Sequence, residues 1–269
     1  MSNTQDKAAA FKAELDSLTA KKRASACTKL VKGLVKEYKG TTARAYLTKY
    51  RAAIKNTYPE LLYRLTIPKA IQAKIQKLDN KKVAQKNRQQ AAIFNHKDMI
   101  EAAIKLLGSG HVGRTCAALC LLTGRRMTEI MKTAKLTNCN NNSNTVYFKG
   151  QLKQDNADLK YKIYTLADRA KIKAALKFIR QTADCRKMTA AQVDAKYNNT
   201  VNTYVKREFA KYIGGGRSSH DLRRCYAAII ADRHKPADKS VSAFYAEILG
   251  HGLDDVGTAL RYQSFYIKS

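Results

Sequence analysis

Five short segments carry arginine, histidine, lysine or tyrosine side chains in types and spacings that could handle a phosphate group. In the first, Thr123-Gly124-Arg125-Arg126, the glycine can end one helix so that an arginine stands at the start of the next. A guanidinium beside the free amides of a helix N-terminus is well placed to bind two oxygens of a phosphate. Taken alone, the segment also fits a helix-turn-helix corner with a surface arginine.

The other four segments are ordinary when each is considered separately. His220 and Arg223 lie three residues apart and share one helix face, but such a pair also occurs by chance. Lys153 stands in the connection after a possible strand, where a lysine is usually just solvated. Leu249-Gly250-His251 precedes Tyr262, and a tyrosine near the end of a helical stretch is more often a core residue than a nucleophile.

The charge balance points to a polyanionic partner. The 269 residues include 51 Lys and Arg against 21 Asp and Glu, which gives a formal net charge of +30. Folded proteins seldom carry such self-repulsion unless a polyanion neutralises it, so nucleic acid is the first partner to expect. A basic tail on an unrelated domain is disfavoured, because Lys alternates with Leu and Val at helical spacing in segments such as 28–39.

Other classes of protein are disfavoured by composition. No apolar stretch is long enough to span a bilayer, and the first ten residues contain no apolar signal region. We therefore expect a cytosolic protein, or a nuclear one in a eukaryotic host, with no membrane partner and no small-molecule substrate. The six cysteines form no CxxC pair and no zinc-like cluster, so we expect reduced thiols and no metal: Cys27, Cys116, Cys120, Cys139, Cys185 and Cys225.

The elements that would position these side chains are mainly helical. The chain has only three prolines and no tryptophan, and its long stretches rich in Ala, Lys and Leu favour helices. In the first part we expect helices at about 6–18, 24–38, 42–56 and 68–93, forming a basic DNA-binding domain over residues 1–95.

A second domain is expected over residues 96–269. It begins with helices at about 97–107 and 112–122, whose apolar faces are dense. Residues 145–148 and 161–166 are enriched in β-branched and aromatic side chains and predict a small antiparallel hairpin. Helical patterns return from residue 168.

The order of the five segments carries a resemblance that none of them carries alone. Arginine after Thr-Gly, a hairpin lysine, His-x-Leu-Arg, Leu-Gly-His and a late tyrosine are the successive boxes of tyrosine recombinases, and residues 97–266 resemble that superfamily. The amino-acid sequences of segments 102–107, 122–130 and 218–223, and less specifically of 41–46, look most like those of the telomere resolvases, or protelomerases. The resemblance implies a helical core-binding domain and a tyrosine recombinase-like catalytic domain that clamp opposite faces of a duplex.

The resemblance also implies a role for each side chain. Arg126 and Arg223 would hold the scissile phosphate, Lys153 would protonate the leaving 5′ oxygen, and Tyr262 would attack, with support from the histidines at positions 220 and 251 (His220 and His251). Fixed guanidinium groups stabilise charge on nonbridging oxygens without a metal, so no cofactor is required. Tyr266 remains an alternative nucleophile, since a continuous helix would place it one turn beyond Tyr262.

The implied reaction converts replicated inverted-repeat telomere junctions into covalently closed hairpin ends. Two alternatives use similar residues: a site-specific recombinase or integrase, and a type IB topoisomerase. A non-catalytic DNA-binding protein is the alternative from another class. In each case the partner is double-stranded DNA, and cleavage of both strands at an inverted repeat implies a dimer on the DNA. The side chains expected to contact DNA are Lys29, Lys32, Lys36, Arg44, Lys49, Arg51, Arg125 and Arg224.

Overall fold

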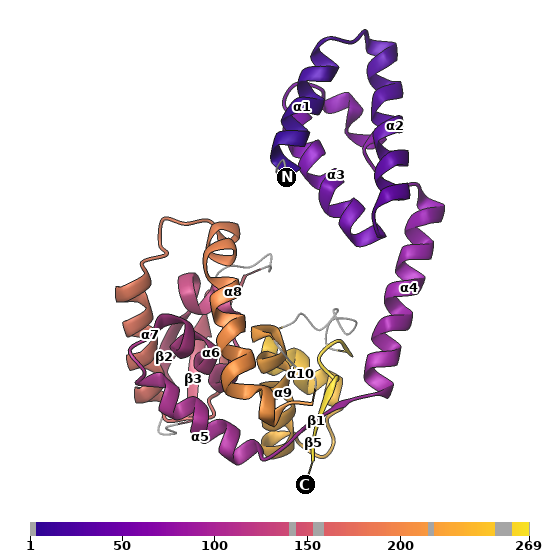
Figure 1. Cartoon of the computed structure of the whole chain (residues 1–269). Helices are drawn as coiled ribbons and strands as arrows, with labels where there is room; N and C mark the ends of the chain where they lie inside the picture. The colour runs from indigo at the N-terminus through magenta and orange to yellow at the C-terminus, as the bar shows by residue number, and fades with distance from the viewer. Residues whose placement is uncertain (1–3, 140–143, 153–158, 215–217, 251–259, 269) are drawn as a thin grey trace. The chain divides into compact units, whose positions relative to one another are not determined.

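The protein consists of two compact units. The computed structural model (Figure 1) describes residues 4–139, 144–152, 159–214, 218–250 and 260–268, apart from the side chains of residues 86 and 87. The chain divides into Met1–Ala84 and Gln85–Ser269. The sequence analysis places the division later, between residues 95 and 96.

The first unit is a small helical domain. Its helices are α1 (Thr4–Asp16), α2 (Ala20–Glu37) and α3 (Gly40–Ile54), followed by the 3-10 helix η1 (Pro59–Arg64). Their buried side chains, including Leu15, Cys27 and Ile54, form one hydrophobic core. Helix α4 (Lys69–Arg88) runs across the boundary between the units. It ends before residue 93, where the sequence pattern extended it, because the chain then enters a strand.

Helix α6 (Val112–Thr123) is the centre of the second unit. It is buried on nearly every side, as expected for a helix that is apolar all round. The helices packed against it are α5 (His96–Leu107), α7 (Arg169–Ala183), α8 (Ala190–Phe209) and α9 (Ser219–His234). The loop that leaves the C-terminus of α6 is therefore fixed by a rigid core.

A three-stranded antiparallel sheet lies beside these helices. It has the order β2 (Lys135–Asn138), β3 (Thr145–Lys149) and β4 (Lys160–Tyr164), with Val146 opposite Ile163. The predicted hairpin corresponds to β3 and β4. The fold class, mainly helical with a small antiparallel sheet, is confirmed; the additional strand β2 is not in the sequence prediction.

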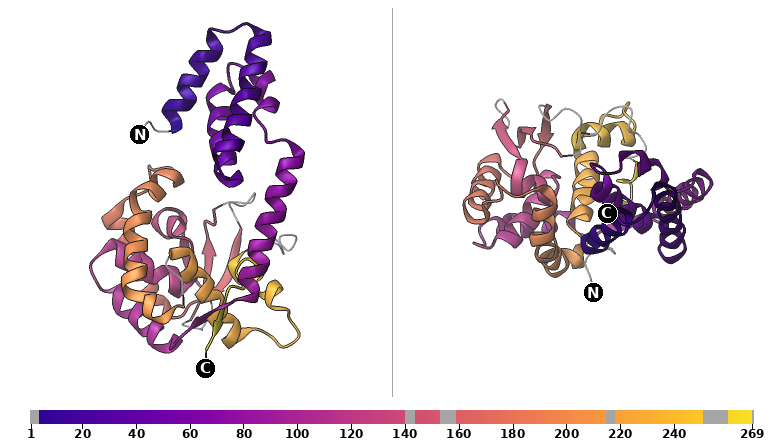
Figure 2. Two further views of the ribbon diagram at one scale, coloured as in Figure 1. Left: turned by 45° about the vertical axis from the view of Figure 1, so that its right-hand side comes forward. Right: turned by 90° about the horizontal axis from the view of Figure 1, so that it is seen from above.

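A second, parallel pairing joins distant parts of the chain. Strand β1 (Ala91–Ile93) pairs with β5 (Phe265–Ile267), and Figure 2 shows these strands side by side in the second unit. Tyr266 therefore lies in a strand, opposite Ala92, and not one helical turn beyond Tyr262. This corrects the helical relation that the sequence spacing suggested.

Two composition-based expectations can be compared with the described residues. No helix in the described ranges is both long enough and apolar enough to cross a membrane. All six cysteines are free and buried.

Gly124 ends helix α6 in a conformation that other residues rarely adopt. Its φ of 66° is in the left-handed region, and its amide donates to the carbonyl of Cys120. A Cβ atom added here would lie 2.1 Å from Cδ1 of Tyr226, a fully buried ring. Glycine thus permits both the turn and the close approach of α9 to the chain that carries Arg125 and Arg126.

We expect Gly124→Ala to lower the free energy of unfolding by about 2–4 kcal/mol, because it combines left-handed backbone strain with overpacking. Urea denaturation measures the change. Gly108→Ala is the matched control: Gly108 also follows a helix, but it has no atom within 4 Å of an added Cβ and a φ of −93°. A loss in the control as large as that in Gly124→Ala would contradict this explanation.

Candidate active site

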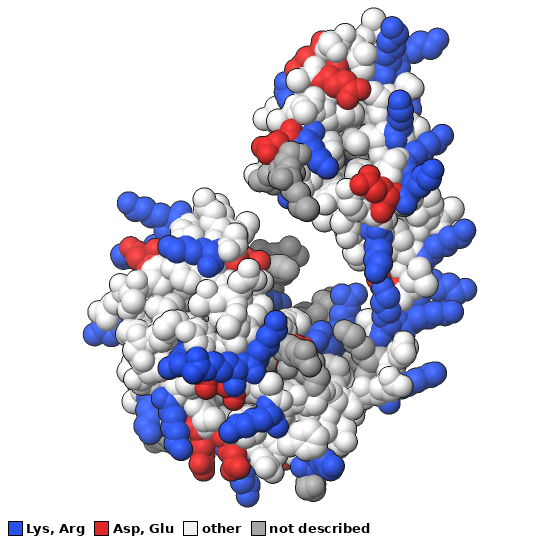
Figure 3. Space-filling view, in the orientation of Figure 1, with Lys and Arg blue, Asp and Glu red and all other residues white. Residues whose placement is uncertain are grey.

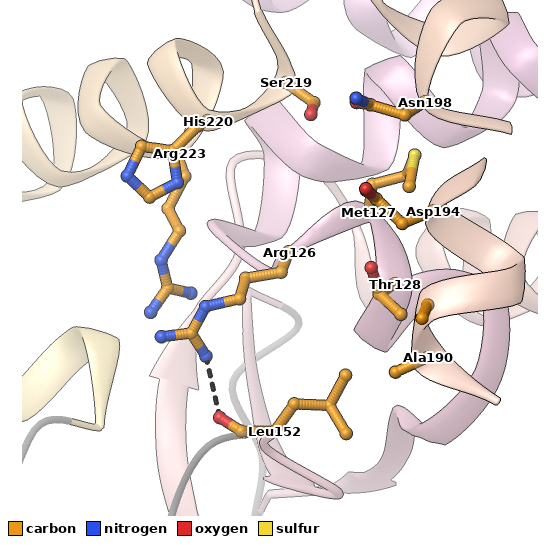
Figure 4. A pocket seen from close by; sticks show the side chains of 11 residues that line it. Arg126, Met127, Thr128, Leu152, Ala190, Asp194, Asn198, Ser219, His220 and Arg223 are labelled. Atoms are coloured by element: carbon orange, nitrogen blue, oxygen red, sulfur yellow. Dashed lines mark hydrogen bonds between the residues drawn. The ribbon is translucent and has the colours of Figure 1, made fainter. Parts of the chain in front are cut away.

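The second unit contains a cavity of about 580 Å³ next to the predicted catalytic residues. Arg126, His220 and Arg223 lie on one side of it, and residues of helix α8 lie on the other (Figure 4). Helix α9 presents His220 and Arg223 from one face, as the three-residue spacing predicts. Arg126 comes from the segment after α6, so two separate elements bring the cationic groups together.

Arg223 is fully buried and joins three segments through its guanidinium group. Its Nη1 donates to the carbonyl of Gly124, its Nη2 donates to the carbonyl of Leu249 at 3.0 Å, and its Nε donates to the hydroxyl of Tyr262 at 3.2 Å. Burial alone would lower the pKa of Arg223, but the neighbouring Tyr262 and Glu129 raise it. The group therefore stays charged although water is excluded.

Glu129 is the buried acid that orients Arg126. One carboxylate oxygen accepts from Nη1 of Arg126 at 2.5 Å, and the other accepts from the backbone amide of Arg126 at 2.9 Å. The first oxygen also accepts from the amide of Leu152 at 3.2 Å. Burial would raise the pKa of Glu129, but Arg223 and Arg126 lower it below its usual value. The carboxylate is therefore ionised.

The sequence analysis did not assign a role to Glu129. The sequence could have predicted an ion pair here, because Glu129 stands three residues after Arg126, which is the spacing of an ion pair within one helical turn. Glu129 begins the π-helical turn η2 (Glu129–Thr133). Arg180 of α7 holds that turn by donating to the carbonyls of Glu129 and Lys132 within it and to that of Ala134, the residue that follows it.

Arg125 was expected to contact DNA; this contact stays a prediction, and in the free protein the side chain is engaged internally. Arg125 is fully buried. Its Nη2 donates to the carbonyl of Ile248 at 2.7 Å, its Nη1 donates to the hydroxyl of Tyr161, and its guanidinium lies 4.8 Å from the ring centre of Phe148. Arg125 therefore ties the sheet to the C-terminus of α10 (Val241–Leu249) and is not available at the surface.

Of the two candidate nucleophiles, only Tyr262 is close to the cationic groups in this structure. Its side chain is 2% exposed, its hydroxyl accepts from Arg223, and its ring centre lies 5.4 Å from that of His220. Tyr266 is 44% exposed on strand β5. The geometry thus favours Tyr262 as the tyrosine that meets a bound phosphate.

His220 combines solvent contact with a strongly unfavourable environment for its charged form. Protein atoms crowd the ring and weaken its solvation, although the residue keeps an exposed surface. This desolvation and the positive charges of Arg224 and Arg223 lower the pKa of His220 to about 4. The imidazole is therefore neutral at pH 7.

Lys153 and His251, both predicted from the sequence to be catalytic, lie outside the described residues. Their described neighbours are held at the site. Leu152 O accepts from Nη1 of Arg126 at 3.1 Å (Figure 4), and Nε2 of Gln151 donates to the carbonyl of Gly250 at 2.7 Å. Gly250 itself has a φ of 68° and would place a Cβ atom 2.2 Å from the hydroxyl oxygen of Tyr161. The segments that lead to Lys153 and His251 are therefore joined to each other and to Arg126.

The remaining side chains expected to contact DNA lie on two units. On the first unit, Arg44 is half-buried and the others are exposed, namely Lys29, Lys32, Lys36, Lys49 and Arg51. Arg224, on the second unit, is half-buried and pairs with Asp221 at 2.8 Å. In the view of Figure 3, Lys and Arg side chains predominate over acidic ones on both units. Contact of these side chains with DNA stays a prediction.

Among the described residues, no group of three or more His, Cys, Asp or Glu side chains could hold a metal ion. Two of the charged groups that line the cavity are the guanidinium groups of Arg126 and Arg223, whose paired donors suit the oxygens of a phosphodiester. With the hydroxyl of Tyr262 beside Arg223, the site has groups suited to the binding and transfer of a phosphoryl group.

The family comparison shows which class of protein this is. Residues 90–265 match the model of the telomere resolvase ResT/TelK catalytic domain. Because this match covers more than half of the chain, the protein belongs to the telomere resolvase family and is a DNA breaking-rejoining enzyme. No curated protein matches its sequence significantly.

Solved structures show the same fold. A structure of protelomerase TelA covalently complexed with substrate DNA has a TM-score of 0.89 and 20% identity, and the alignment covers 99% of this chain and 89% of that one. A TelA mutant complexed with DNA hairpin product has a TM-score of 0.86 and 21% identity, over 96% and 86% of the two chains. Protelomerase TelK complexed with substrate DNA has a TM-score of 0.66 and 22% identity, over 99% of this chain and 58% of the longer TelK chain.

We expect Glu129→Ala to lower the free energy of unfolding by about 3–5 kcal/mol, because it leaves buried arginine groups without their carboxylate. Glu129→Gln keeps the shape and should cost about 1–3 kcal/mol. The control is Glu208→Gln, which breaks a partly exposed pair with Arg114 at 3.5 Å and should cost at most about 1 kcal/mol. Equal losses for Glu129→Ala and Glu208→Gln in urea denaturation would show that the buried carboxylate has no special role.

We expect His220 to titrate near pH 4 in the free protein and at a higher pH with DNA bound, because a phosphate offsets the repulsion by the arginines. The unfolded chain binds this proton near pH 6.5, so His220 lowers stability as the pH falls from about 6.5 towards about 4. NMR of labelled imidazole carbons measures the pKa, with assignment by His220→Gln. Titration near pH 6.5 in the free protein, or no change on adding DNA, would contradict this account.

Proposed function

We propose that this enzyme resolves replicated inverted-repeat telomere junctions into covalently closed hairpin ends, with Tyr262 as its nucleophile. The observation that carries the residue assignment is the hydrogen bond between the Tyr262 hydroxyl and Arg223, beside the cavity that Arg126 also lines. The TelA complexes with substrate and with hairpin product support the reaction type. They share the fold of this chain at about one-fifth sequence identity.

The proposed reaction has two balanced phosphoryl transfers. The phenol of Tyr262 releases its proton to solvent as its oxygen attacks the scissile phosphorus, which forms a 3′-phosphotyrosyl bond and breaks the bond to the 5′ oxygen. Lys153 protonates that leaving oxygen, so the strand ends in a 5′-hydroxyl. Because the phosphotyrosyl bond conserves the energy of the phosphodiester, a 5′-hydroxyl can reverse the step without a nucleotide cofactor.

The described side chains suit the transition state of these steps. Charge develops on the nonbridging oxygens of the phosphorus, and Arg126 and Arg223 would stabilise it. Both guanidinium groups are already held by fixed partners, so little reorganisation is needed when the phosphate enters. Neutral His220 would donate a hydrogen bond to an oxygen without adding a further buried charge.

The hairpin outcome depends on which 5′-hydroxyl attacks. When each 5′ end folds back onto the complementary strand that carries the phosphotyrosine, each half of the duplex becomes a closed hairpin. An inverted-repeat target places two such sites about a twofold axis, so we propose that two copies of the protein act on one duplex. The basic side chains of both units would supply salt-dependent affinity for phosphates, in the cytoplasm where the replicon lies.

The test is incubation of the purified full chain, in EDTA, with linear duplexes that carry inverted repeats from its own replicon. Denaturing gels with and without protease detect hairpin products and covalent protein-DNA species. We expect snap-back hairpins of half the substrate length. Recombinant duplexes or relaxed plasmid would keep the tyrosine chemistry and reject telomere resolution, and binding without a covalent species would leave only a DNA-binding protein.

In the same assay, Tyr262→Phe should abolish the covalent species and change duplex affinity by less than about twofold, because only the attacking oxygen is removed. Tyr266→Phe is the matched control and should cleave normally. Persistent cleavage by Tyr262→Phe, with loss in Tyr266→Phe, would move the nucleophile to the strand β5.

A further inference from the structure

The cavity beside the predicted scissile phosphate has two chemically different sides. Arg126 and Arg223 make one side cationic, with neutral His220 beside them, and Asp194 and Asn198 of α8 face it from the other (Figure 4). A phosphate alone needs only the cationic side. The volume of the cavity, about 580 Å³, lies in the range of about 300–1,000 Å³ that small-molecule pockets have. The cavity is therefore large enough for more of a nucleotide than its phosphate.

Apolar side chains lie on both sides of the cavity, with Leu152 beside Arg126 and Ala190 on α8 (Figure 4). Met127, Leu152, Ala190 and Ala191 also line the cavity. The Met127 side chain is buried, with 4% of its surface exposed, and its thioether adapts well to a flat ring. A nucleotide needs such a mixed surface: cationic groups for its phosphate, apolar contacts for its sugar and for the face of its base, and polar groups for the hydrogen-bonding edge of the base.

Asp194 and Asn198 are suited to that edge. They lie four residues apart on α8 and therefore share one face of the helix. Asp194 is exposed, and within the described part of the chain no hydrogen bond or ion pair engages its carboxylate. An unpaired carboxylate repels the DNA backbone, whereas it accepts hydrogen bonds from the amino group of a base.

The amide of Asn198 is oriented by its neighbours. Its Oδ1 accepts from Nδ2 of Asn202 at 2.9 Å, and Oδ1 of Asn202 accepts from the amide of Ser219 at 2.9 Å. This chain of hydrogen bonds begins at the first turn of α9, the helix that carries His220 and Arg223. The Asn198 amide therefore presents its NH₂ group as a donor, beside the acceptor Asp194.

We propose that this cavity binds the base of a nucleotide that flanks the scissile phosphate, and that Asp194 and Asn198 select a base with an amino group next to a ring-nitrogen acceptor. Adenine and cytosine have this edge. The base would donate its amino hydrogen to Asp194 and accept from Asn198, while its phosphate lies on Arg126 and Arg223. The inference rests on the proposed function, since it requires DNA cleavage at this site.

A base that enters the cavity must leave the duplex stack, which costs a few kcal/mol. Hairpin formation already requires nucleotides near the cut to unpair and turn back. Binding of one such base would therefore stabilise a conformation that the reaction needs. It would also supply sequence information, which contacts to phosphates alone do not carry.

The experiment uses the full chain and a duplex whose cut site has been mapped through the covalent adduct. Each nucleotide flanking the scissile phosphate is changed in turn to the four natural bases, to purine and to 2-pyrimidinone. The last two lack only the amino group of adenine and cytosine. We expect the rate of adduct formation at one position to favour adenine or cytosine over its amino-free analogue by about five- to 150-fold. The natural base that shows this preference distinguishes the two.

Asp194→Asn and Asn198→Ala should each remove most of this preference. Asn199→Ala is the matched control, since Asn199 is the next residue of α8, is exposed and does not line the cavity. Thermal unfolding should be unchanged in all three variants. Absence of any base preference in the parent protein, or the same preference in Asp194→Asn and Asn198→Ala, would overturn the inference. Absence of an adduct with every duplex would instead reject the proposed function itself.

Discussion

The organisation of the second unit depends on the neutralisation of buried positive charge. Arg125 and Arg223 are fully buried, and Arg126 lies beside them with 22% of its side chain exposed. Among the described residues, Glu129 is the carboxylate whose pKa is lowered by all three of these arginines. Burial of unpaired charge is costly. Three guanidinium groups around one carboxylate therefore leave an excess of positive charge, which an entering phosphate would neutralise.

The hydrogen bonds of the arginines explain how the protein tolerates this excess. Four hydrogen bonds from Arg125 and Arg223 go to backbone carbonyls at the ends of helices: those of Thr123 and Gly124 at the end of α6, and those of Ile248 and Leu249 at the end of α10. Helix C-termini carry partial negative charge and free carbonyls. They satisfy the donors without cancelling the full charge. The turn at Gly124 and the left-handed Gly250 are the backbone features that bring these carbonyls to the arginines.

The sequence allowed the elements and several site residues to be predicted, but not which side chains would be buried. The helical period placed His220 and Arg223 together because both stand on one helix. It did not distinguish Arg125 from Arg126, since burial of one of two adjacent arginines depends on Phe148 and Tyr161 of the sheet. The prediction that Tyr266 lies one helical turn beyond Tyr262 was wrong for a similar reason. Tyr266 lies in β5, and the parallel pairing of β5 with β1 joins residues far apart in the sequence. The spacing of Glu129 from Arg126 could have predicted an ion pair, but not that the carboxylate is buried.

The same electrostatic reasoning applies to the opposite wall of the cavity. An acid near a site built for phosphate lowers the affinity of that site for the DNA backbone, so Asp194 weakens the most general source of DNA binding. The cationic side has a surplus of charge that can offset this loss. What an acid adds is discrimination, because it accepts from an amino group and repels a phosphate or a carbonyl oxygen at the same position. A cavity with guanidinium groups on one side and Asp194 with Asn198 on the other therefore separates two tasks: the first side stabilises the reacting phosphate of any sequence, and the second determines which nucleotide can place its phosphate there.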